Sequence, residues 1–311
     1  MSDVVVETTP FRGWRNALRV ANRKVELLVT LDVGPRILSY SLVGGVNVFN
    51  VYEDQAGGVG EPQWKNRGGH RLWLAPESAE LTYHPDNHPV GWERIGNEGV
   101  RLTSPPETGS GFQKQIDLQL SKDSTAVKVT HRIKRIAPAP CRAAPWALSV
   151  MAAGGIAILP QPPMGEHPRD LLPNRRLVVW PYTELADPRY GFGRRFITLR
   201  QASGGRPTKI GMPSAQGWAG YLLKQTLFVK RFTWQANVEY PDDGCNLEVF
   251  TNARMLELET LGPLQQFQPG DQAEWVEQWE LHANLPVFPA AGLAEQDDYL
   301  FTCLNGLISH S

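Results

Sequence analysis

The sequence predicts an all-β protein built from many short strands, with few short helices. Apolar and polar residues alternate along many short segments, which is the period of a strand with one buried face. The 29 glycines and 25 prolines are scattered along the chain, as frequent turns between short strands require. Helical periodicity is scarce. Because no Pro/Ser-rich linker divides the chain and no repeat is obvious, we expect a single β domain spanning residues 1–311.

The first clear strand runs from Val25 to Val33, where every odd position is apolar. Gly34-Pro35 interrupts this pattern, and a second strand with a buried face follows over residues 38–42. Gly44-Gly45 predicts a turn, after which residues 46–52 resume the strand pattern. This part of the chain therefore predicts consecutive antiparallel strands.

Alternation returns in residues 127–133, 196–199 and 275–279, which we expect to be strands. The longest irregular segment runs from Leu159 to Pro173 and is rich in proline. It is either a linker between domains or, in one large sandwich, a long loop over one face. From Ala291 to Ile308, apolar residues recur at spacings of three and four, so we expect a short helix or a docked tail over about 291–308.

The composition excludes several functions. The 31 basic and 32 acidic residues leave a net charge of -1, so we expect no nucleic-acid partner. The three cysteines lie far apart and form neither a disulfide framework nor a CxxC metal site. The chain starts without a signal-peptide pattern, and its most apolar stretch, Trp146 to Leu159, is too short to span a bilayer. We therefore expect a cytoplasmic protein without membrane contact.

The signatures of several enzyme classes are missing from the sequence. It has no P-loop motif, no GxGxxG after a strand, no HExxH and no GxSxG. We therefore expect no cofactor. Two clusters of polar and aromatic residues remain as candidates for a site.

The first cluster lies between Trp64 and Trp92 and mixes charged and aromatic side chains. Aromatic faces beside hydrogen-bonding groups suit a sugar, which has apolar C–H faces and a rim of hydroxyls. The three histidines are spaced by 14 and 4 residues, which matches no metal-ligand motif, so we expect no metal. Alternatively, Trp73 and Trp92 belong to the core and the histidines are solvated. The polar members are Arg67, His70, Arg71, Glu77, His84, Asp86 and His88.

The second cluster lies between Asn246 and His282. On a strand, Glu257 and Glu259 point to one face while Leu256 and Leu258 point to the other. Such an acidic face is usually exposed to solvent. If it lines a concave sheet instead, each carboxylate raises the pKa of the other, and one becomes a suitable general base near neutral pH.

These residues resemble the galactose mutarotase-like superfamily, which contains the aldose 1-epimerases and the hexose-6-phosphate epimerases. Arg67-Gly68-Gly69, followed by Trp73 and Pro76, is similar to the RGG…W.P segment of the hexose-6-phosphate branch. Segments reading GGHRLWLAPE, YHPDNHPVGW and LELETLGPL resemble an uncharacterised bacterial subgroup. The order of motifs matches roughly from Gly13 to Leu285. The resemblance implies a large twisted sandwich of antiparallel strands, the galactose mutarotase-like supersandwich, that binds a sugar on a concave face.

The resemblance also implies roles for individual residues. In the family, a glutamate takes the proton from the anomeric hydroxyl and a histidine protonates the ring oxygen, without a metal. Glu259 matches that glutamate, with Glu257 as the alternative. Arg67 matches an arginine that binds the sugar or its phosphate, and His84 matches a substrate-binding histidine.

Further residues complete the expected site. We expect Arg71, His88, Trp73, Glu257 and Trp180 to contact the substrate, together with Arg67. Because arginine pairs bind phosphate in bidentate fashion, the nearby Arg67 and Arg71 leave both a free sugar and a sugar phosphate open as substrates.

The chain departs from the family in one respect. The family's acid histidine lies on a mid-chain strand, and the corresponding stretch, Ala144 to Gly155, contains no histidine. His131 alternates with apolar residues, which indicates a buried strand position. Either His70 or His84 supplies the proton, or the protein binds carbohydrate without catalysis. Another sugar isomerase or a lyase is a third hypothesis, because one fold supports several chemistries.

Overall fold

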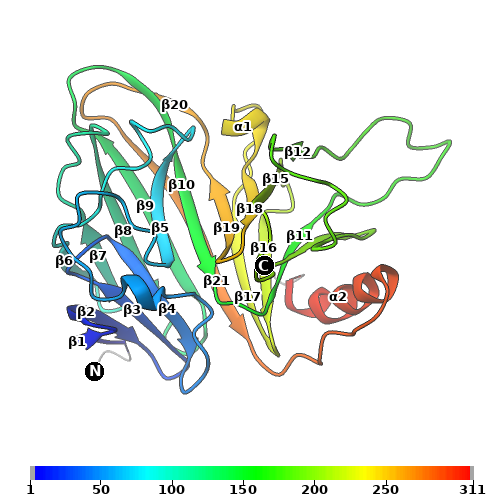
Figure 1. Cartoon of the computed structure of the whole chain (residues 1–311), viewed down its shortest axis with the longest axis horizontal. Helices are drawn as coiled ribbons and strands as arrows, with labels where there is room; N and C mark the ends of the chain where they lie inside the picture. The colour runs from blue at the N-terminus through cyan, green and yellow to red at the C-terminus, as the bar shows by residue number, and fades with distance from the viewer. Residues whose placement is uncertain (1–3, 309–311) are drawn as a thin grey trace.

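The computed structural model describes residues 4–308, which form two large antiparallel sheets packed face to face (Figure 1). The larger sheet has 11 strands and the smaller has 10. The larger sheet runs in the order β1 (Val5–Phe11), β2 (Trp14–Ala21), β3 (Val25–Thr30), β4 (Arg36–Leu42), β5 (Gly69–Ala75), β10 (Cys141–Met151), β19 (Leu256–Leu261), β18 (Leu247–Thr251), β15 (Thr208–Met212) and β12 (Val178–Val179), with β20 (Gln265–Phe267) paired to β10. The all-β sandwich predicted from the sequence is confirmed.

The smaller sheet covers the inner face of the larger one. Its order is β13 (Tyr190–Phe192), β14 (Phe196–Arg200), β11 (Ile156–Pro160), β16 (Trp218–Leu223), β17 (Thr226–Phe232), β21 (Gln272–His282), β9 (Val127–Arg135), β8 (Phe112–Leu120), β7 (Gly99–Thr103) and β6 (Gly91–Ile95). The helical elements are the 3-10 turn η1 (Glu53–Gln55), the short turn α1 (Pro241–Gly244) and the C-terminal helix α2 (Leu293–Ile308). No described helix is both long enough and apolar enough to cross a membrane.

The main core lies between the sheets and follows directly from strand alternation. On β21, Trp275 and Trp279 are buried, while Glu274 and Gln278, which directly precede them, are exposed. On β19, Leu258 belongs to this core and the flanking glutamates point to the opposite face. Burial of many such apolar side chains is the main favourable contribution to the stability of the sandwich.

One expected strand is absent. Residues 46–52 make only isolated bridges within the described part of the chain, at Phe49 and Val51. The reason is Asn47, whose side-chain oxygen accepts a hydrogen bond from the Tyr40 backbone amide at 3.0 Å. Its amide nitrogen donates to the Leu38 carbonyl at 2.9 Å, so the side chain occupies groups that a neighbouring strand would pair with.

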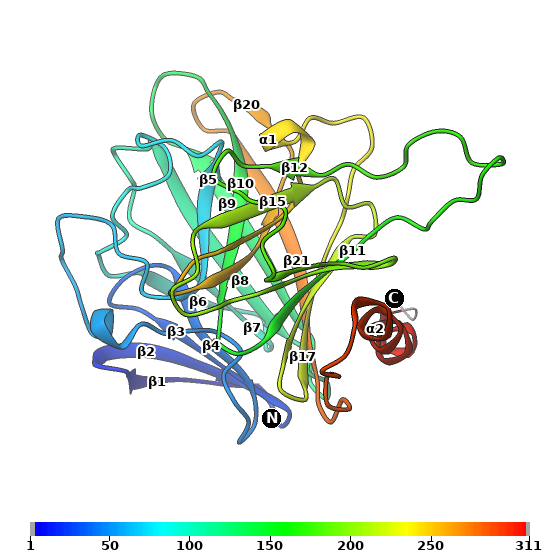
Figure 2. The ribbon, with the colours of Figure 1, turned by 45° about the vertical axis from the view of Figure 1, so that its right-hand side comes forward.

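The C-terminal helix and the proline-rich segment both differ in detail from expectation. The helix α2 is 16 residues long and docks on the smaller sheet through Leu300 and Leu304. The segment 161–176, which we name the arm, is irregular as expected, but it does not lie over a face of the sandwich. It projects away from the body as a long loop (Figures 1 and 2), because its two halves bond to each other through Asn174 and Arg175.

Candidate functional site

A cavity of about 150 Å³ lies on the outer face of the larger sheet, turned away from the smaller sheet. Strands β5, β10, β15, β18 and β19 form its floor. Loops that carry Trp64, Tyr83 and Tyr182 contribute to its walls. The lining residues are Trp64, Asn66, Arg71, Trp73, Glu77, Tyr83, Trp146, Leu148, Tyr182, Lys209, Phe250, Met255, Glu257 and Glu259.

Strand register brings the floor residues together from distant parts of the sequence. Leu148 on β10 pairs with Arg71 on β5 and with Glu259 on β19. Glu259 in turn pairs with Glu248 on β18. Paired residues of neighbouring strands project from the same face, so these side chains form one row across the sheet. The two glutamates of β19 lie on one face, as predicted, and that face is buried rather than open to solvent.

Glu259 is the central acid of the cavity. Its Oε2 atom accepts hydrogen bonds from Trp146 Nε1 at 2.9 Å and from Lys209 Nζ at 2.9 Å. Burial raises the pKa of Glu259 above its ordinary value of 4.5, and the Lys209 ammonium partly opposes that increase. A carboxylate whose pKa lies closer to neutrality is better suited to act as a general base.

Lys209 joins two buried carboxylates. Its Nζ atom lies 2.6 Å from Oε2 of Glu248 and 2.9 Å from Oε2 of Glu259. Burial alone would lower the pKa of Lys209, but the two carboxylates outweigh it and hold the pKa well above the ordinary value of 10.5. Burial also raises the pKa of Glu248 well above 4.5. Lys209 therefore carries its proton, while Glu248 favours its neutral form.

Arg71 forms a second charged pair in an aromatic setting. Its Nη2 atom lies 2.8 Å from Oε1 of Glu257, and its guanidinium lies 4.1 Å from the Trp73 ring centroid and 5.3 Å from that of Trp64. Both pairs of the site therefore involve a glutamate of β19. The aromatic rings limit the positions that the arginine can take.

Three buried donors of this cavity have no hydrogen-bond partner among residues 4–308. They are Trp64 Nε1, Arg71 Nε and Arg71 Nη1. A buried donor left without a partner costs free energy, so most such groups in folded proteins are satisfied. Unpartnered donors around a hollow with aromatic walls suit a ligand rich in oxygen acceptors.

Two tyrosines from loops, Tyr83 and Tyr182, also line the cavity. The hydroxyl of Tyr83 donates a hydrogen bond to Glu77. Burial raises the pKa of Tyr182 to about 12. Trp180, two residues earlier, places its ring centroid 4.7 Å from Lys209 Nζ without lining the cavity. Both tyrosines are therefore neutral near pH 7.

The structure brings together only part of the set of residues expected from the sequence. Arg71, Trp73, Glu257 and Glu259 line the cavity, and Trp180 contacts its lysine. Arg67 does not line it.

Arg67 is instead buried in a neighbouring loop network. Its Nη2 atom donates to Glu61 at 2.5 Å and to Asn87 at 2.7 Å. Arg67 and Arg71 therefore do not form the phosphate clamp that their sequence spacing left open.

His84 and His88 lie outside the cavity as well. Together with Asp86 and Glu107 they line a separate small hollow of about 20 Å³. His84 packs there against the loop at Gly109, and His88 is exposed at the surface.

His70 points to the opposite side of the sheet from Arg71, because successive residues of a strand alternate between faces. It lies in the core between the sheets, where His70 Nε2 is 2.7 Å from His131 Nε2. His131 Nδ1 donates to the carbonyl of Trp275 at 3.0 Å, so its Nε2 accepts from His70. His70 Nδ1 then accepts from the Ser149 hydroxyl at 2.8 Å. The buried position predicted for His131 is confirmed.

His70, His131 and Glu277 offer ligand atoms that lie within 4.8 Å of one another, which is close enough for a metal ion. The hydrogen bonds and the ion pair of these residues indicate a structural role instead. Every ring nitrogen of the two histidines is already hydrogen-bonded. Glu277 accepts from Trp279 at 2.7 Å and pairs with Lys230 at 3.1 Å, whose positive charge opposes a cation at this position. The cluster is therefore a satisfied polar network that joins the two sheets.

Sequence reasoning missed Lys209 and Trp146 as members of the site, and it included Trp64 in the first cluster without assigning it a role. The local pattern offered no signal for Lys209, because it alternates with Ile210 as an ordinary outward-facing residue of the strand 208–212 would. Trp146 and Leu148 occupy the cavity side of β10, the stretch where the resemblance led us to look for a histidine.

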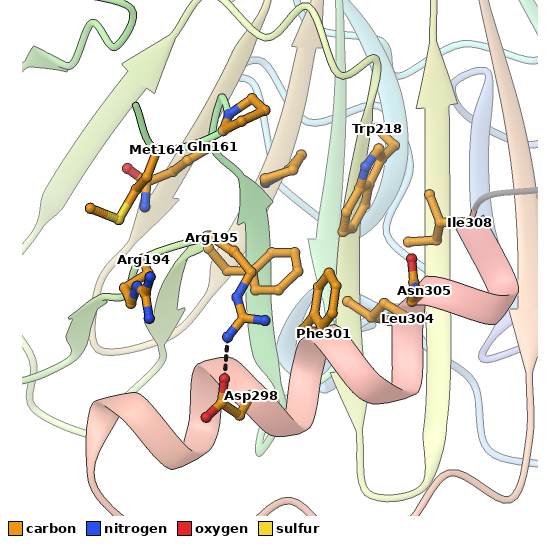
Figure 3. A pocket seen from close by; sticks show the side chains of 13 residues that line it. Gln161, Met164, Arg194, Arg195, Trp218, Asp298, Phe301, Leu304, Asn305 and Ile308 are labelled. Carbon is orange, nitrogen blue, oxygen red and sulfur yellow. Dashed lines mark hydrogen bonds and ion pairs between the residues drawn. The ribbon is translucent and has the colours of Figure 1, made fainter. Parts of the chain in front are cut away.

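A larger hollow lies far from these groups, between helix α2 and the smaller sheet (Figure 3). Its volume is about 690 Å³, and Trp218, Phe301 and Leu304 are among its apolar walls. Its charged members include Arg195 and Asp298, which pair with each other. It has no buried acid–base cluster among its lining residues, so the smaller cavity is the candidate active site.

The fold and the cavity define a β-sandwich with a polar and aromatic site on the outer face of one sheet. No protein-family model matches the chain, and no curated protein matches it either. Among solved structures, a galactose mutarotase-like protein from Lactobacillus casei is 9% identical, with a TM-score of 0.56 over 86% of this chain and 100% of the other. A candidate aldose 1-epimerase from Klebsiella pneumoniae is 11% identical, with a TM-score of 0.58 over 96% and 87%.

A galactose mutarotase related enzyme from Lactobacillus acidophilus also matches, at 7% identity and a TM-score of 0.54 over 86% of this chain and 98% of the other. At such low identity these likenesses concern the fold. The chain has the galactose mutarotase-like fold, and the resemblance drawn from its sequence motifs is confirmed at that level.

Proposed function

We propose that the protein interconverts the anomers of a free sugar by acid–base ring opening, in the manner of an aldose 1-epimerase. The observation that carries the proposal is the contact between Glu259 and Lys209 at 2.9 Å inside the cavity. A carboxylate with a raised pKa beside a protonated amine places a base and an acid within reach of the two oxygens bonded to one sugar carbon. Because the charge of Glu259 helps to raise the pKa of Lys209, a proton taken by Glu259 makes Lys209 a better acid.

The reaction needs these two groups close together. The anomeric hydroxyl and the ring oxygen of a pyranose are both bonded to C1. Glu259 takes the proton of the anomeric hydroxyl while Lys209 Nζ gives a proton to the ring oxygen, and the bond between C1 and the ring oxygen breaks. The product is an open-chain aldehyde, with a carboxylic acid at Glu259 and an amine at Lys209.

Ring closure reverses these transfers on the other face of the carbonyl. After rotation about the C1–C2 bond, the freed sugar hydroxyl attacks C1 and gives its proton to Lys209. Glu259 returns its proton to the carbonyl oxygen, which becomes the anomeric hydroxyl of the other anomer. Both groups regain their starting states, so the cycle consumes no co-reactant.

Aromatic residues and orphaned donors support a sugar as the ligand. The indole rings of Trp64 and Trp73 offer flat apolar surfaces to the C–H faces of a sugar ring. The free N–H groups of Trp64 and Arg71 offer donors to its hydroxyl oxygens.

The charges in the cavity favour a sugar without phosphate. Arg71 is paired with Glu257, and Lys209 with Glu248 and Glu259, so each cation already faces a carboxylate. A phosphate would have to displace one of these carboxylates and lie beside it.

Binding of a sugar without turnover is the second candidate. It is favoured by one observation, that β10 presents Trp146 and Leu148 to the cavity and no histidine. Under this hypothesis Lys209 and Glu259 only hydrogen-bond to the sugar.

Two-dimensional exchange NMR on a panel of free and phosphorylated sugars separates the two candidates. Cross-peaks between α and β anomer signals that grow only with protein present are the expected result for the epimerase. Line broadening of one sugar without anomer exchange would instead establish the binding protein. If no sugar in the panel responds, both candidates are rejected for those sugars.

A further inference from the structure

A second hollow, which we name the side hollow, adjoins the candidate active site. The cavity that contains Glu259 has a volume of about 150 Å³, below the roughly 300–1,000 Å³ of most small-molecule sites. The side hollow has a volume of about 520 Å³. Because Tyr182 lines both spaces, they adjoin each other at this side chain. A ligand that extends from the cavity past Tyr182 therefore occupies a site of ordinary size.

The side hollow lies between two loops, and its lining residues come from 181–189 and 202–207. The first loop connects β12 to β13, and the second leads directly into β15, the strand that carries Lys209. Thr183 attaches the first loop to the same strand. Its hydroxyl donates to the carbonyl of Lys209 at 2.7 Å and accepts from the backbone amide of Lys209 at 2.8 Å. Both loops are therefore held at a fixed position relative to the proposed acid.

Arg189 presents an unused hydrogen-bond donor beside the side hollow. It is the one buried residue among those that line this space, with 8% exposure. Its Nη2 atom donates to the Asp187 carboxylate and to the Arg206 carbonyl, both at 2.6 Å. Its Nη1 atom has no hydrogen-bond partner within the described part of the chain. A hydroxyl oxygen of a ligand would satisfy this donor, whose lack of a partner costs free energy.

The glycine at position 205 keeps space beside that donor. A Cβ atom on Gly205 would lie 2.5 Å from Arg189 Nη1, so any larger residue would crowd the guanidinium. Gly205 also belongs to the lining of the side hollow. The second loop therefore leaves open the part of Arg189 that has no partner.

The side hollow suits a neutral, hydroxylated ligand. Its charged lining residues are two acids and two bases, so it has no net charge that would select a phosphate. The ring of Tyr182 and three prolines add apolar surface beside these polar groups. This mixture matches a sugar unit, which has apolar C–H faces and a rim of hydroxyls. The charged residues are Glu184, Asp187, Arg189 and Arg206.

We propose that the side hollow is a second sugar subsite, so that the ligand of the cavity is the reducing end of an oligosaccharide. The reducing sugar lies in the cavity with its C1 beside Glu259 and Lys209. The next sugar unit lies past Tyr182, where one of its hydroxyl oxygens accepts from Arg189 Nη1. The reducing unit keeps a free anomeric hydroxyl, so the ring opening described above applies to it unchanged. The inference rests on the proposed function for its chemistry, while binding tests the subsite itself.

Matched pairs of sugars test the inference. Glucose, galactose, mannose and xylose are each compared with a 1,4-linked disaccharide of the same sugar, by titration and by two-dimensional exchange NMR. For the sugar that fits the cavity, we expect the disaccharide to bind about 10-fold more tightly, as one or two further hydrogen bonds provide. The α and β signals of its reducing end are expected to exchange at correspondingly lower sugar concentration.

Two variants fill the side hollow from its two loops. Ala186→Trp and Ala202→Trp each place a large ring at an exposed lining position. Each is expected to remove the difference in affinity between a disaccharide and its monosaccharide. Ala139→Trp is the matched control, because Ala139 is exposed between β9 and β10 and lines neither space, and it is expected to keep that difference. Circular dichroism verifies that each variant is folded.

The outcomes distinguish the subsite from the proposed function. Anomer exchange with equal affinity for every monosaccharide and its disaccharide overturns the subsite and leaves the proposed function standing. A disaccharide preference that both tryptophan variants remove, without anomer exchange, supports the subsite and rejects the epimerase. A preference that persists in both variants overturns the subsite, and so does a lack of binding by every sugar of the set.

Discussion

The ammonium of Lys209 lies between two buried carboxylates, 2.9 Å from Glu259 and 2.6 Å from Glu248. The three residues come from neighbouring strands β15, β18 and β19, so the sheet itself fixes their separation. Burial raises the pKa of both glutamates, and the lysine limits that increase. The arrangement keeps an acid and a base in contact beside the same cavity.

Replacing Glu259 by Gln is expected to abolish protein-dependent anomer exchange while leaving sugar affinity nearly unchanged. The amide keeps the size and an acceptor oxygen for Trp146 but cannot take a proton. Loss of a general base lowers rates by about 10²–10⁴-fold. Exchange NMR measures the rate, and titration of the same sugar measures affinity. Exchange at the wild-type rate in this variant would remove Glu259 from the proposed mechanism.

Two variants of Lys209 separate the effect of its positive charge from the effect of its proton donation. Lys209→Met removes both, so the pKa of Glu259 rises further and the acid limb of the exchange rate moves to higher pH. Lys209→Arg keeps the charge, but the guanidinium is a weaker acid than the ammonium of lysine. We expect a loss of about 10²-fold or more in both variants, with the acid limb shifted only in the methionine variant. The pH profile of the exchange rate measures this.

Both Lys209 variants alter a buried charged cluster, so the control is a test that each variant remains folded. Removing one partner of a buried ion pair destabilises a protein by about 3–5 kcal/mol. Thermal unfolding of both variants shows whether they remain folded at the temperature of the rate measurement. Exchange in folded Lys209→Met at the wild-type rate would mean that another group gives the proton.

The variant Trp64→Phe is expected to weaken sugar binding without lowering the free energy of unfolding. The Nε1 donor of Trp64 is buried and has no partner within the described residues 4–308, so its removal relieves an unsatisfied group and leaves the free energy of unfolding unchanged or slightly higher. If a sugar accepts from this donor, its affinity falls by about 5–10-fold, the loss of one hydrogen bond. Urea unfolding and sugar titration measure the two effects. The matched control is Trp92→Phe, since Trp92 is exposed outside the cavity.

Strand alternation explains which site residues could be predicted. The period of two placed Glu257 and Glu259 on one face, and the structure agrees. The same rule excludes His70 from a site that contains Arg71, because adjacent strand residues face opposite sides of a sheet. That exclusion was available in the sequence alone. It was missed because the segment from Trp64 to Trp92 was treated as a single cluster.

The rest of the site depends on pairing between distant segments. Lys209 meets Glu259 only because β18 lies between their strands, and no local pattern specifies that order. Arg67, His84 and His88 lie near Arg71 in sequence, yet they stabilise or border neighbouring loops. Local patterns thus predicted the fold class, the acidic strand, Arg71 and Trp73, while Lys209 and Trp146 required the three-dimensional register.

The network of His70, His131 and Ser149 predicts a specific loss of stability in acid. Burial lowers the pKa of both histidines below the ordinary value of 6.5, and the nearby Lys230 ammonium lowers it further. The Glu277 carboxylate beside His131 acts in the opposite direction but does not outweigh burial. Both rings are therefore neutral in the folded protein.

The unfolded chain binds more protons than the folded protein as the pH falls below about 6.5, so the free energy of unfolding decreases there. Each histidine contributes a slope of up to about 1.4 kcal/mol per pH unit. In His70→Phe this contribution is lost, and the decrease between about pH 8 and pH 5 becomes shallower than in the wild type. His88→Gln, at an exposed histidine outside the network, is the control and is expected to keep the wild-type slope. Urea unfolding across this pH range measures the slopes, and equal slopes for His70→Phe and the wild type would show that the network does not link protonation to folding.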